Sequence, residues 1–161
     1  MEPTEHSEPI SVGIGNALIT FPRSWRIGSK SEEGIIARSA SGRERATISI
    51  ISFNKPISFD QFSLMCHQRV EAEKRDLKDG FVHPDSPAPR DASDGFRLFY
   101  TGGDKSTHRV FSAYLIQIES QVVTVYLESL GIPLTEHSET FRALLSTLKR
   151  RKRTLPGEST R

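Results

Sequence analysis

Residues 95–129 read GFRLFYTGGDKSTHRVFSAYLIQIESQVVTVYLES, and this stretch decides the class of fold. Three runs rich in aromatic and β-branched residues lie within it, at residues 95–101, 108–118 and 122–129. Such runs are typical of strands, and the short polar connections between them favour antiparallel neighbours. The stretch therefore predicts a three-stranded antiparallel meander.

Further strands are predicted upstream of the meander. They occupy residues 10–14, 17–21, 34–38 and 46–53. Gly15 and Asn16 separate the first two runs, and such a pair favours a tight hairpin turn. In the last run Ile48, Ile50 and Ser52 recur at every second position, so they share one face of the strand.

Two helices complete the pattern. Ser58 followed by Gln61 has the spacing of a capping box, which predicts the start of a helix that runs towards Gly80. Its apolar face holds Phe59, Phe62, Cys66, Val70 and Leu77. After Pro133 a second helix is predicted from the apolar stripe Phe141, Leu144, Leu145 and Leu148.

The order of these elements is strands, helix, strands, helix. It lacks the strand–helix–strand alternation of a parallel sheet, so we expect an α+β fold with an antiparallel sheet of about six to seven strands flanked by two main helices. We assign residues 1–9 to a disordered acidic N-terminus, residues 10–150 to a single α+β domain, and residues 151–161 to a basic disordered tail.

The formal charge of +2 is the sum of three unequal parts. Residues 1–9 carry −3, residues 149–161 carry +5, and residues 10–148 hold sixteen basic and sixteen acidic side chains. A neutral body weighs against a large nucleic-acid platform, because such a platform needs clustered Lys and Arg. The basic run at residues 149–153 continues from the second helix, where cations complement the helix dipole. We expect removal of residues 149–161 to leave the fold largely intact.

Features of targeting are scarce in this sequence. The single cysteine, Cys66, cannot form an internal disulfide, which suits a reducing compartment. No stretch approaches the ~18 apolar residues of a membrane helix, and residues 1–9 lack the apolar core of a signal peptide. We therefore expect a cytoplasmic protein without membrane insertion, provided that no signal peptide precedes this chain.

The familiar catalytic and metal-binding motifs are missing from the sequence. The histidines lie in separate segments and at no zinc-site spacing: His6, His67, His83, His108 and His137. No Gly-x-Ser-x-Gly, Ser-x-x-Lys or His-Glu-x-x-His motif occurs, and Gly13 and Gly15 lack the third glycine of a dinucleotide-binding loop. Cys66 is expected to be buried and inert. We expect no catalytic, metal-binding or cofactor-binding residues, and no cofactor.

Residues 83–94 contain three prolines and predict a long irregular loop. The charged side chains of this loop are predicted to contact a protein partner, because complementary charge speeds encounter and sets specificity. They are Asp85, Arg90, Asp91 and Asp94.

The sequence resembles the PsbP-like superfamily, which also holds a Ran-binding nuclear import factor family and the bacterial DcrB-like proteins. The resemblance rests on residues 21–25 (FPRSW), 57–62 (ISFDQF) and 141–148 (FRALLSTL). They look like that group's strand–Pro–x–x–Trp segment, the start of its first long helix and its final helix. The resemblance spans residues 10–150 and implies a PsbP-like α+β fold.

Within the bacterial branch the chain looks most like the cytoplasmic Eag-type adaptor chaperones of type VI secretion. Those proteins hold the apolar transmembrane segments of toxic effectors before export. The basic run at residues 149–153 and the proline-rich loop at residues 83–94 depart from that pattern. No groove residue is carried over from the family.

The leading prediction is a non-catalytic protein-binding module that acts as an adaptor or chaperone for a secreted type VI effector. One alternative is an immunity protein that neutralises a cognate toxin through residues 83–94. Another is a small hydrolase whose site forms only in the fold, with His67 or His108 beside a carboxylate. The partner is expected to be an effector or toxin protein and not nucleic acid. The oligomeric state is left open and includes a homodimer.

Overall fold

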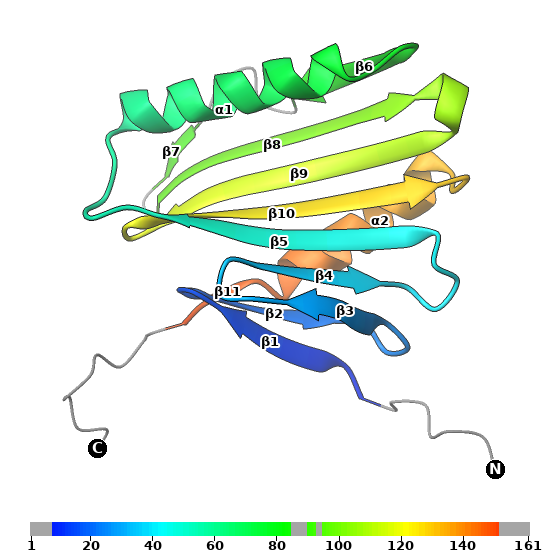
Figure 1. Ribbon diagram of the computed structural model, residues 1–161, viewed down its shortest axis with the longest axis horizontal. Helices are drawn as coiled ribbons and strands as arrows, with labels where there is room; N and C mark the ends of the chain where they lie inside the picture. The colour runs from blue at the N-terminus through cyan, green and yellow to red at the C-terminus, as the bar shows by residue number, and fades with distance from the viewer. Residues whose placement is uncertain (1–7, 85–89, 93–94, 152–161) are drawn as a thin grey trace.

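The computed structural model describes residues 8–84, 90–92 and 95–151 (Figure 1). In chain order its elements are β1 (Ile10–Ile14), β2 (Ala17–Phe21), β3 (Arg26–Lys30), β4 (Gly34–Arg38), β5 (Glu44–Ser52), α1 (Phe59–Arg75), β6 (Gly80–Pro84), β7 (Arg90–Ala92), β8 (Gly95–Asp104), a 3-10 turn (Lys105–Thr107), β9 (Arg109–Ile118), β10 (Gln121–Leu130), α2 (Leu134–Ser146) and β11 (Lys149–Arg150).

The strands form two antiparallel sheets. In the larger sheet the order is β3-β4-β5-β10-β9-β8-β6, and β7 also pairs with β8. Its centre is the predicted meander β8–β9–β10, whose ladders run without a break over Arg97–Asp104 and Gln121–Leu130. The smaller sheet has the order β1-β2-β11. The α+β class with an antiparallel sheet is confirmed, and the larger sheet has eight strands.

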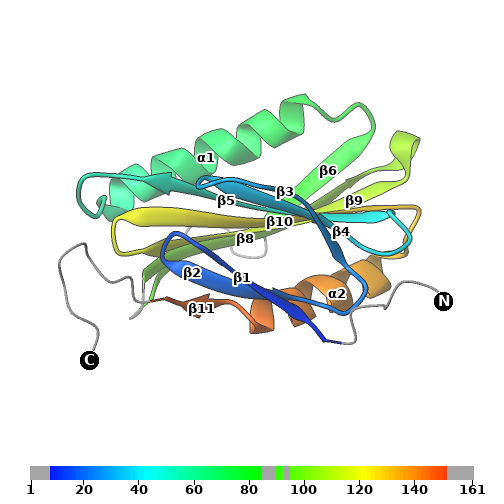
Figure 2. The same ribbon diagram turned by 60° about the horizontal axis from the view of Figure 1, so that its bottom comes forward.

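The two helices lie on opposite sides of the larger sheet (Figure 2). Helix α1 covers one face, where Phe62 and Cys66 pack with residues of β8 and β9 such as Tyr100 and Phe111. Helix α2 and the smaller sheet cover the other face, where a second apolar core holds residues such as Phe141. The prediction of an antiparallel sheet flanked by two helices is confirmed.

Local signals explain where α1 begins. Ser58 accepts a hydrogen bond from the backbone N–H of Gln61, and the Gln61 side chain accepts one from the backbone N–H of Ser58. The predicted capping box is therefore confirmed. The helix ends at Arg75, and the backbone N–H of Asp76 and Leu77 close its last turn. The helix therefore ends before the predicted stop at Gly80, which is the first residue of β6.

The structure adds strands that the sequence pattern did not predict. Strand β3 was missed because its residues, RIGSK, are largely polar and lack an apolar alternation. The prediction of an irregular loop over residues 83–94 is wrong for His83, Pro84 and residues 90–92. Both β6 and β7 pair with β8 at the margin of the sheet, where a proline at a strand end costs no ladder hydrogen bond. Residues 85–89 and 93–94 lie outside the described residues.

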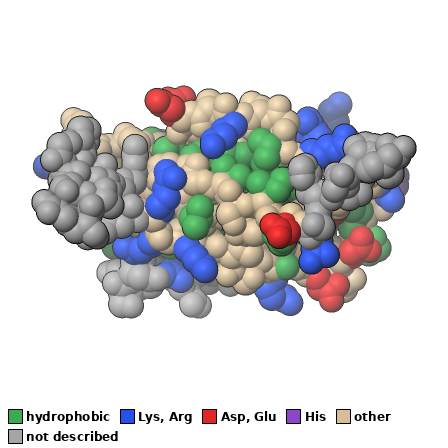
Figure 3. All heavy atoms as spheres, turned by 90° about the horizontal axis from the view of Figure 1, so that it is seen from below, with side chains coloured by type: hydrophobic (Ala, Val, Ile, Leu, Met, Phe, Trp, Pro, Cys, Tyr) green, Lys and Arg blue, Asp and Glu red, His purple; other side chains and the backbone are tan. Residues whose placement is uncertain are grey.

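Strands β1 and β3 are the outer strands of their sheets and lie on the same side of the molecule (Figure 1). Seen from that side, hydrophobic side chains gather near the centre of the surface, with Lys and Arg side chains around them (Figure 3). Ile10 on β1 and Ile27 on β3 are partly buried against the core beneath. Trp25, between β2 and β3, is 5% exposed and stacks on Phe21.

None of the helices in the described ranges is long and apolar enough to span a bilayer.

Candidate functional site

The partner-binding residues predicted on residues 83–94 are only partly placed by the structure. Asp85 and Asp94 lie outside the described residues. Arg90 and Asp91 are described by their backbone alone, which pairs with Arg97 and Phe96 of β8. The described part of the structure therefore does not bring the four predicted side chains into one site.

A groove runs along the side of α2 that faces β8. It consists of three adjoining hollows of about 380, 420 and 410 Å³. The first and second share Phe81 and Leu134, and the second and third share Leu145. We call this surface the α2 groove.

Two periodicities of the sequence build the α2 groove. Strand β9 contributes Val110, Ser112, Tyr114 and Ile116, because every second residue of a strand faces the same side. Helix α2 contributes Leu134, Ser138, Phe141, Arg142 and Leu145, whose spacing by three or four residues places them on one helical face. Strands β8 and β6 supply Arg97, Phe99, Thr101, Phe81 and His83.

The floor of the groove is apolar and partly open to solvent. Leu134 is 48% exposed and Phe81 is 38% exposed, although both side chains are large and hydrophobic. Phe99, Leu145 and Leu148 are half-buried beside them. Large apolar side chains left open along a concave surface are typical of a site that binds another apolar group.

The rim of the groove is basic. Lys105, Arg142, Lys149 and Arg150 are exposed lining residues, and no ion pair is found for any of them within the described part of the chain. The one acidic lining residue is Asp104, whose carboxylate already accepts hydrogen bonds from the backbone N–H of Ser106 and from the Ser106 hydroxyl. These bonds hold the pKa of Asp104 below its usual value. The groove therefore favours a ligand that carries negative charge beside its apolar part.

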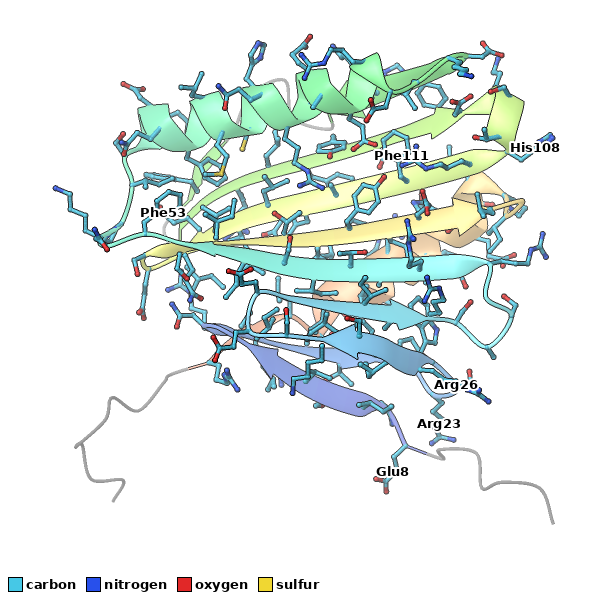
Figure 4. All side chains as sticks on the ribbon, viewed as in Figure 1. Glu8, Arg23, Arg26, Phe53, His108 and Phe111 are labelled. Carbon is cyan, nitrogen blue, oxygen red and sulfur yellow. The ribbon has the colours of Figure 1, made fainter. Side chains whose placement is uncertain are left out.

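A network of charged and phenolic side chains lies between α1 and the other face of the sheet, near the labelled Phe111 (Figure 4). Glu73 of α1 is 3.3 Å from Arg109 and accepts hydrogen bonds from the hydroxyls of Tyr100 and Tyr126, at 3.2 Å each. Arg109 also donates to Tyr126 and to Glu128.

This network is largely buried, and its groups satisfy one another. Burial, with the neighbouring Glu73 carboxylate as a further cause, raises the pKa of Tyr126 well above its usual value. Burial likewise raises the pKa of Tyr100 to about 12. Both phenols therefore stay protonated and donate to Glu73. The arrangement fixes α1 on the sheet.

A buried Ser–His–Ser arrangement lies under the α2 groove. The Nε2 atom of His137 is 2.9 Å from the Ser112 hydroxyl, and its Nδ1 atom is 2.7 Å from the Ser129 hydroxyl. Burial lowers the pKa of His137 to about 4. The third group is a hydroxyl where serine hydrolases place a carboxylate, so nothing beside the ring stabilises an imidazolium. His137 and Ser129 are fully buried and Ser112 is 1% exposed, so the three side chains act as packing for α2.

The cysteine and histidines that could serve catalysis do not converge on one site among the described residues. Cys66 is 1% exposed on the inner face of α1, and burial raises the pKa of its thiol to about 12. His67 is exposed on α1, and His108 lies at the far end of the sheet (Figure 4). His108 and Asp104 line the same hollow, but Asp104 is engaged by Ser106. Within the described ranges, no three His, Cys, Asp or Glu side chains are close enough to hold a metal ion.

The α2 groove was missed by sequence reasoning for a physical reason. The stripe Phe141, Leu144 and Leu145 shows which face of α2 is apolar, but it does not show that Leu145 lies at the margin of the covered surface. Two signals were present: Leu134 stands outside the buried stripe, and Arg142 interrupts it on the groove side. These two residues indicate a groove only when the strands that pack beneath α2 are known.

Solved structures share this fold although their sequences differ widely. No family model and no curated protein matches the sequence. PsbP of the cyanobacterium Synechocystis sp. PCC 6803 is similar, with a TM-score of 0.57 and 14% identity over 84% of this chain and 86% of that one. LpqN of Mycobacterium tuberculosis, involved in cell envelope biogenesis, has a TM-score of 0.55 and 12% identity over 94% of this chain and 90% of that one.

A structure from Bacteroides thetaiotaomicron VPI-5482 is also similar, with a TM-score of 0.51 and 12% identity over 90% of this chain. The match covers 47% of that chain, so this chain spans about half its length. The fold is therefore PsbP-like, as residues 21–25, 57–62 and 141–148 predict. The finer likeness to DcrB-like and Eag-type proteins stays a prediction.

Proposed function

We propose that this protein is a non-catalytic protein-binding module that holds an apolar segment of another protein in the α2 groove. The main support is the combination of an open apolar floor, which includes Leu134 and Phe81, with an unpaired basic rim. Helix α2 has thirteen residues and is therefore about 20 Å long, enough to accompany three to four turns of a bound helix. The bound segment is expected to carry acidic residues beside its apolar ones.

An adaptor chaperone for a secreted effector is the cellular role that we infer for such a module, acting in the cytoplasm before export. Apolar export segments need cover before they leave the cell, and the groove supplies apolar contact. The basic rim would select segments with acidic flanks and would speed their encounter. The PsbP-like fold is compatible with this role, and the buried His137 and Cys66 favour binding over catalysis.

Substitution in the groove tests the proposal. Replacement Leu134→Glu is expected to weaken binding of a synthetic apolar peptide with Glu flanks about tenfold, because apolar contact is lost and like charge is introduced. Leu64→Glu is the matched control, since Leu64 is 58% exposed on α1, which lies on the opposite face of the sheet. Fluorescence anisotropy with the Glu-flanked peptide and with a Lys-flanked peptide of the same centre measures both effects.

Two results would contradict the proposal. One is equal binding of the Glu-flanked and Lys-flanked peptides. The other is an equal loss of affinity in Leu134→Glu and Leu64→Glu. Co-expression with toxin-like proteins from adjacent genes separates the cellular roles: a chaperone binds the apolar N-terminal region of an effector and gives no protection against the mature toxin domain, whereas an immunity protein protects.

A further inference from the structure

Strand β1 lacks the features that keep the other outer strands from pairing with foreign strands. Strand β3 carries the exposed Arg26 and Lys30 and has a shift of register between Ile27 and Ser29. Strand β11 consists of two exposed basic residues, and β6 ends at Pro84. Charges, irregular register and proline are the usual means by which proteins protect a sheet edge.

The sequence of β1 contains none of these protective features. Its five residues are Ile10, Ser11, Val12, Gly13 and Ile14, and all five pair regularly with β2. Hydrogen-bonded and non-hydrogen-bonded residue pairs alternate along an antiparallel ladder. The pair that flanks the two-residue turn, Ile14 and Ala17, is hydrogen-bonded, so the pair Val12 and Ile19 is hydrogen-bonded as well. The backbone groups of Ser11 and Gly13 therefore face away from β2, towards an absent neighbour.

Space for a neighbouring strand exists beside β1. A hollow of about 1030 Å³ adjoins its C-terminal half and is lined by Gly13 and Ile14 on one side and by Ile50 and Ile51 on the other. Ile51 is 51% exposed. The hydrophobic patch in Figure 3 lies on this side of the molecule. A strand placed here would gain apolar contact as well as backbone hydrogen bonds.

The two ends of β1 carry opposite charge. Glu8, two residues before the start of β1, is exposed and makes no ion pair within the described ranges, although Arg23 and Arg26 lie at the same corner (Figure 4). At the other end the Arg151 side chain lies against Gly13 and donates to the carbonyl of Gly15 at 3.2 and 2.9 Å.

Further charges line the hollow beside β1. They are Lys30 at the end of β3, and Glu32 and Glu33 on the turn between β3 and β4.

We propose that two copies of this chain pair through β1, antiparallel about a two-fold axis at Val12. Ser11 of each copy then lies opposite Gly13 of the other, and the two smaller sheets become one continuous six-stranded sheet. This register brings Glu8 of each copy opposite Asn16 of the other, whose carbonyl accepts from the backbone N–H of Arg151. Opposite charges meet at both ends, which favours a second copy over an unrelated strand.

Sedimentation velocity over a range of concentrations tests the pairing. The wild-type chain of 18.1 kDa is expected to double its mass as concentration rises at low ionic strength. Ser11→Lys is expected to abolish the doubling, because two lysines then lie beside the axis. Thr20→Lys is the matched control: Thr20 is the cross-strand partner of Ser11 and shares its 2.8 Å hydrogen bond, but it lies on the central strand β2.

A charge exchange tests the register. Glu8→Arg and Arg151→Glu are each expected to weaken dimerisation about tenfold at low salt, and the double variant is expected to restore it. Far-UV circular dichroism confirms that each variant is folded. The proposal is overturned by a wild-type chain that stays at 18.1 kDa from micromolar to submillimolar concentration. It is also overturned if Thr20→Lys acts like Ser11→Lys or if the double variant stays monomeric.

Discussion

The buried position of His137 favours the neutral ring. A neutral imidazole can accept from one serine hydroxyl and donate to the other, whereas burial without a neighbouring carboxylate disfavours the charged form. The folded-state pKa of about 4 lies below the usual value for the unfolded chain. Between about pH 6.5 and pH 4 the unfolded chain therefore binds more protons than the folded one, and stability decreases as the pH falls through this window.

We predict that acid destabilises the wild-type chain more than a variant without this histidine. The free energy of unfolding is expected to fall by about 3 kcal/mol more in wild type than in His137→Asn between neutral pH and pH 4. Urea unfolding at several pH values measures the difference. The control is His67→Asn, an exposed site on α1, which should follow wild type. Parallel pH profiles for wild type and His137→Asn would contradict the assignment.

At the scale of the element, α1 depends on one buried carboxylate. Glu73 is 14% exposed and compensates Arg109, whose side chain is 20% exposed. Removal of one partner leaves a buried charge without compensation, so Glu73→Ala is expected to lower the free energy of unfolding by about 3 kcal/mol. Chemical denaturation followed by circular dichroism measures this loss.

Glu71 provides the control for that prediction because it belongs to the same helix. Its ion pair with Lys74, at 3.4 Å, joins two side chains that are about half exposed. Such surface pairs contribute less than about 0.5 kcal/mol, so Glu71→Ala should be nearly neutral. Equal effects of the two substitutions would show that the network does not fix α1.

The elements that sequence reasoning predicts well are those with a strong local pattern. Ser58 and Gln61 predict the start of α1, and the apolar stripe that contains Phe141 predicts α2. Strands β3 and β6 could not be predicted in this way, because they are held by pairing with β4 and β8 and not by their own apolar alternation. The α2 groove was unpredictable for a similar reason: Leu134, Phe81 and Tyr114 come from three distant segments.

At the scale of the whole molecule, the structure changes what we expect from removal of the C-terminus. Lys149 and Arg150 form β11 on β2, and Arg151 donates its backbone N–H to the carbonyl of Asn16. Removal of residues 149–161 deletes these bonds and turns β2 into an outer strand. We now predict a loss of about 2 kcal/mol in the free energy of unfolding for that truncation.

Removal of residues 152–161 is the matched truncation, since it retains β11 and Arg151. It is expected to leave the melting temperature close to that of the full chain. Differential scanning calorimetry compares the three proteins. An unchanged melting temperature after removal of residues 149–161 would show that β11 contributes little, as the sequence alone led us to expect.

The position of β11 also determines the order in which parts of the chain can fold during synthesis. The meander β8–β9–β10 pairs neighbours in sequence and can form as soon as it leaves the ribosome. The hairpin β1–β2 precedes both helices and the meander, yet its third strand follows them, because Ala17 and Leu18 pair with Arg150 and Lys149. The smaller sheet can therefore close only after residues 149–150 have left the ribosome. Until then the nascent protein exposes the apolar face of its earliest strands, so ribosome-bound chains of this protein are the form most in need of a chaperone of their own.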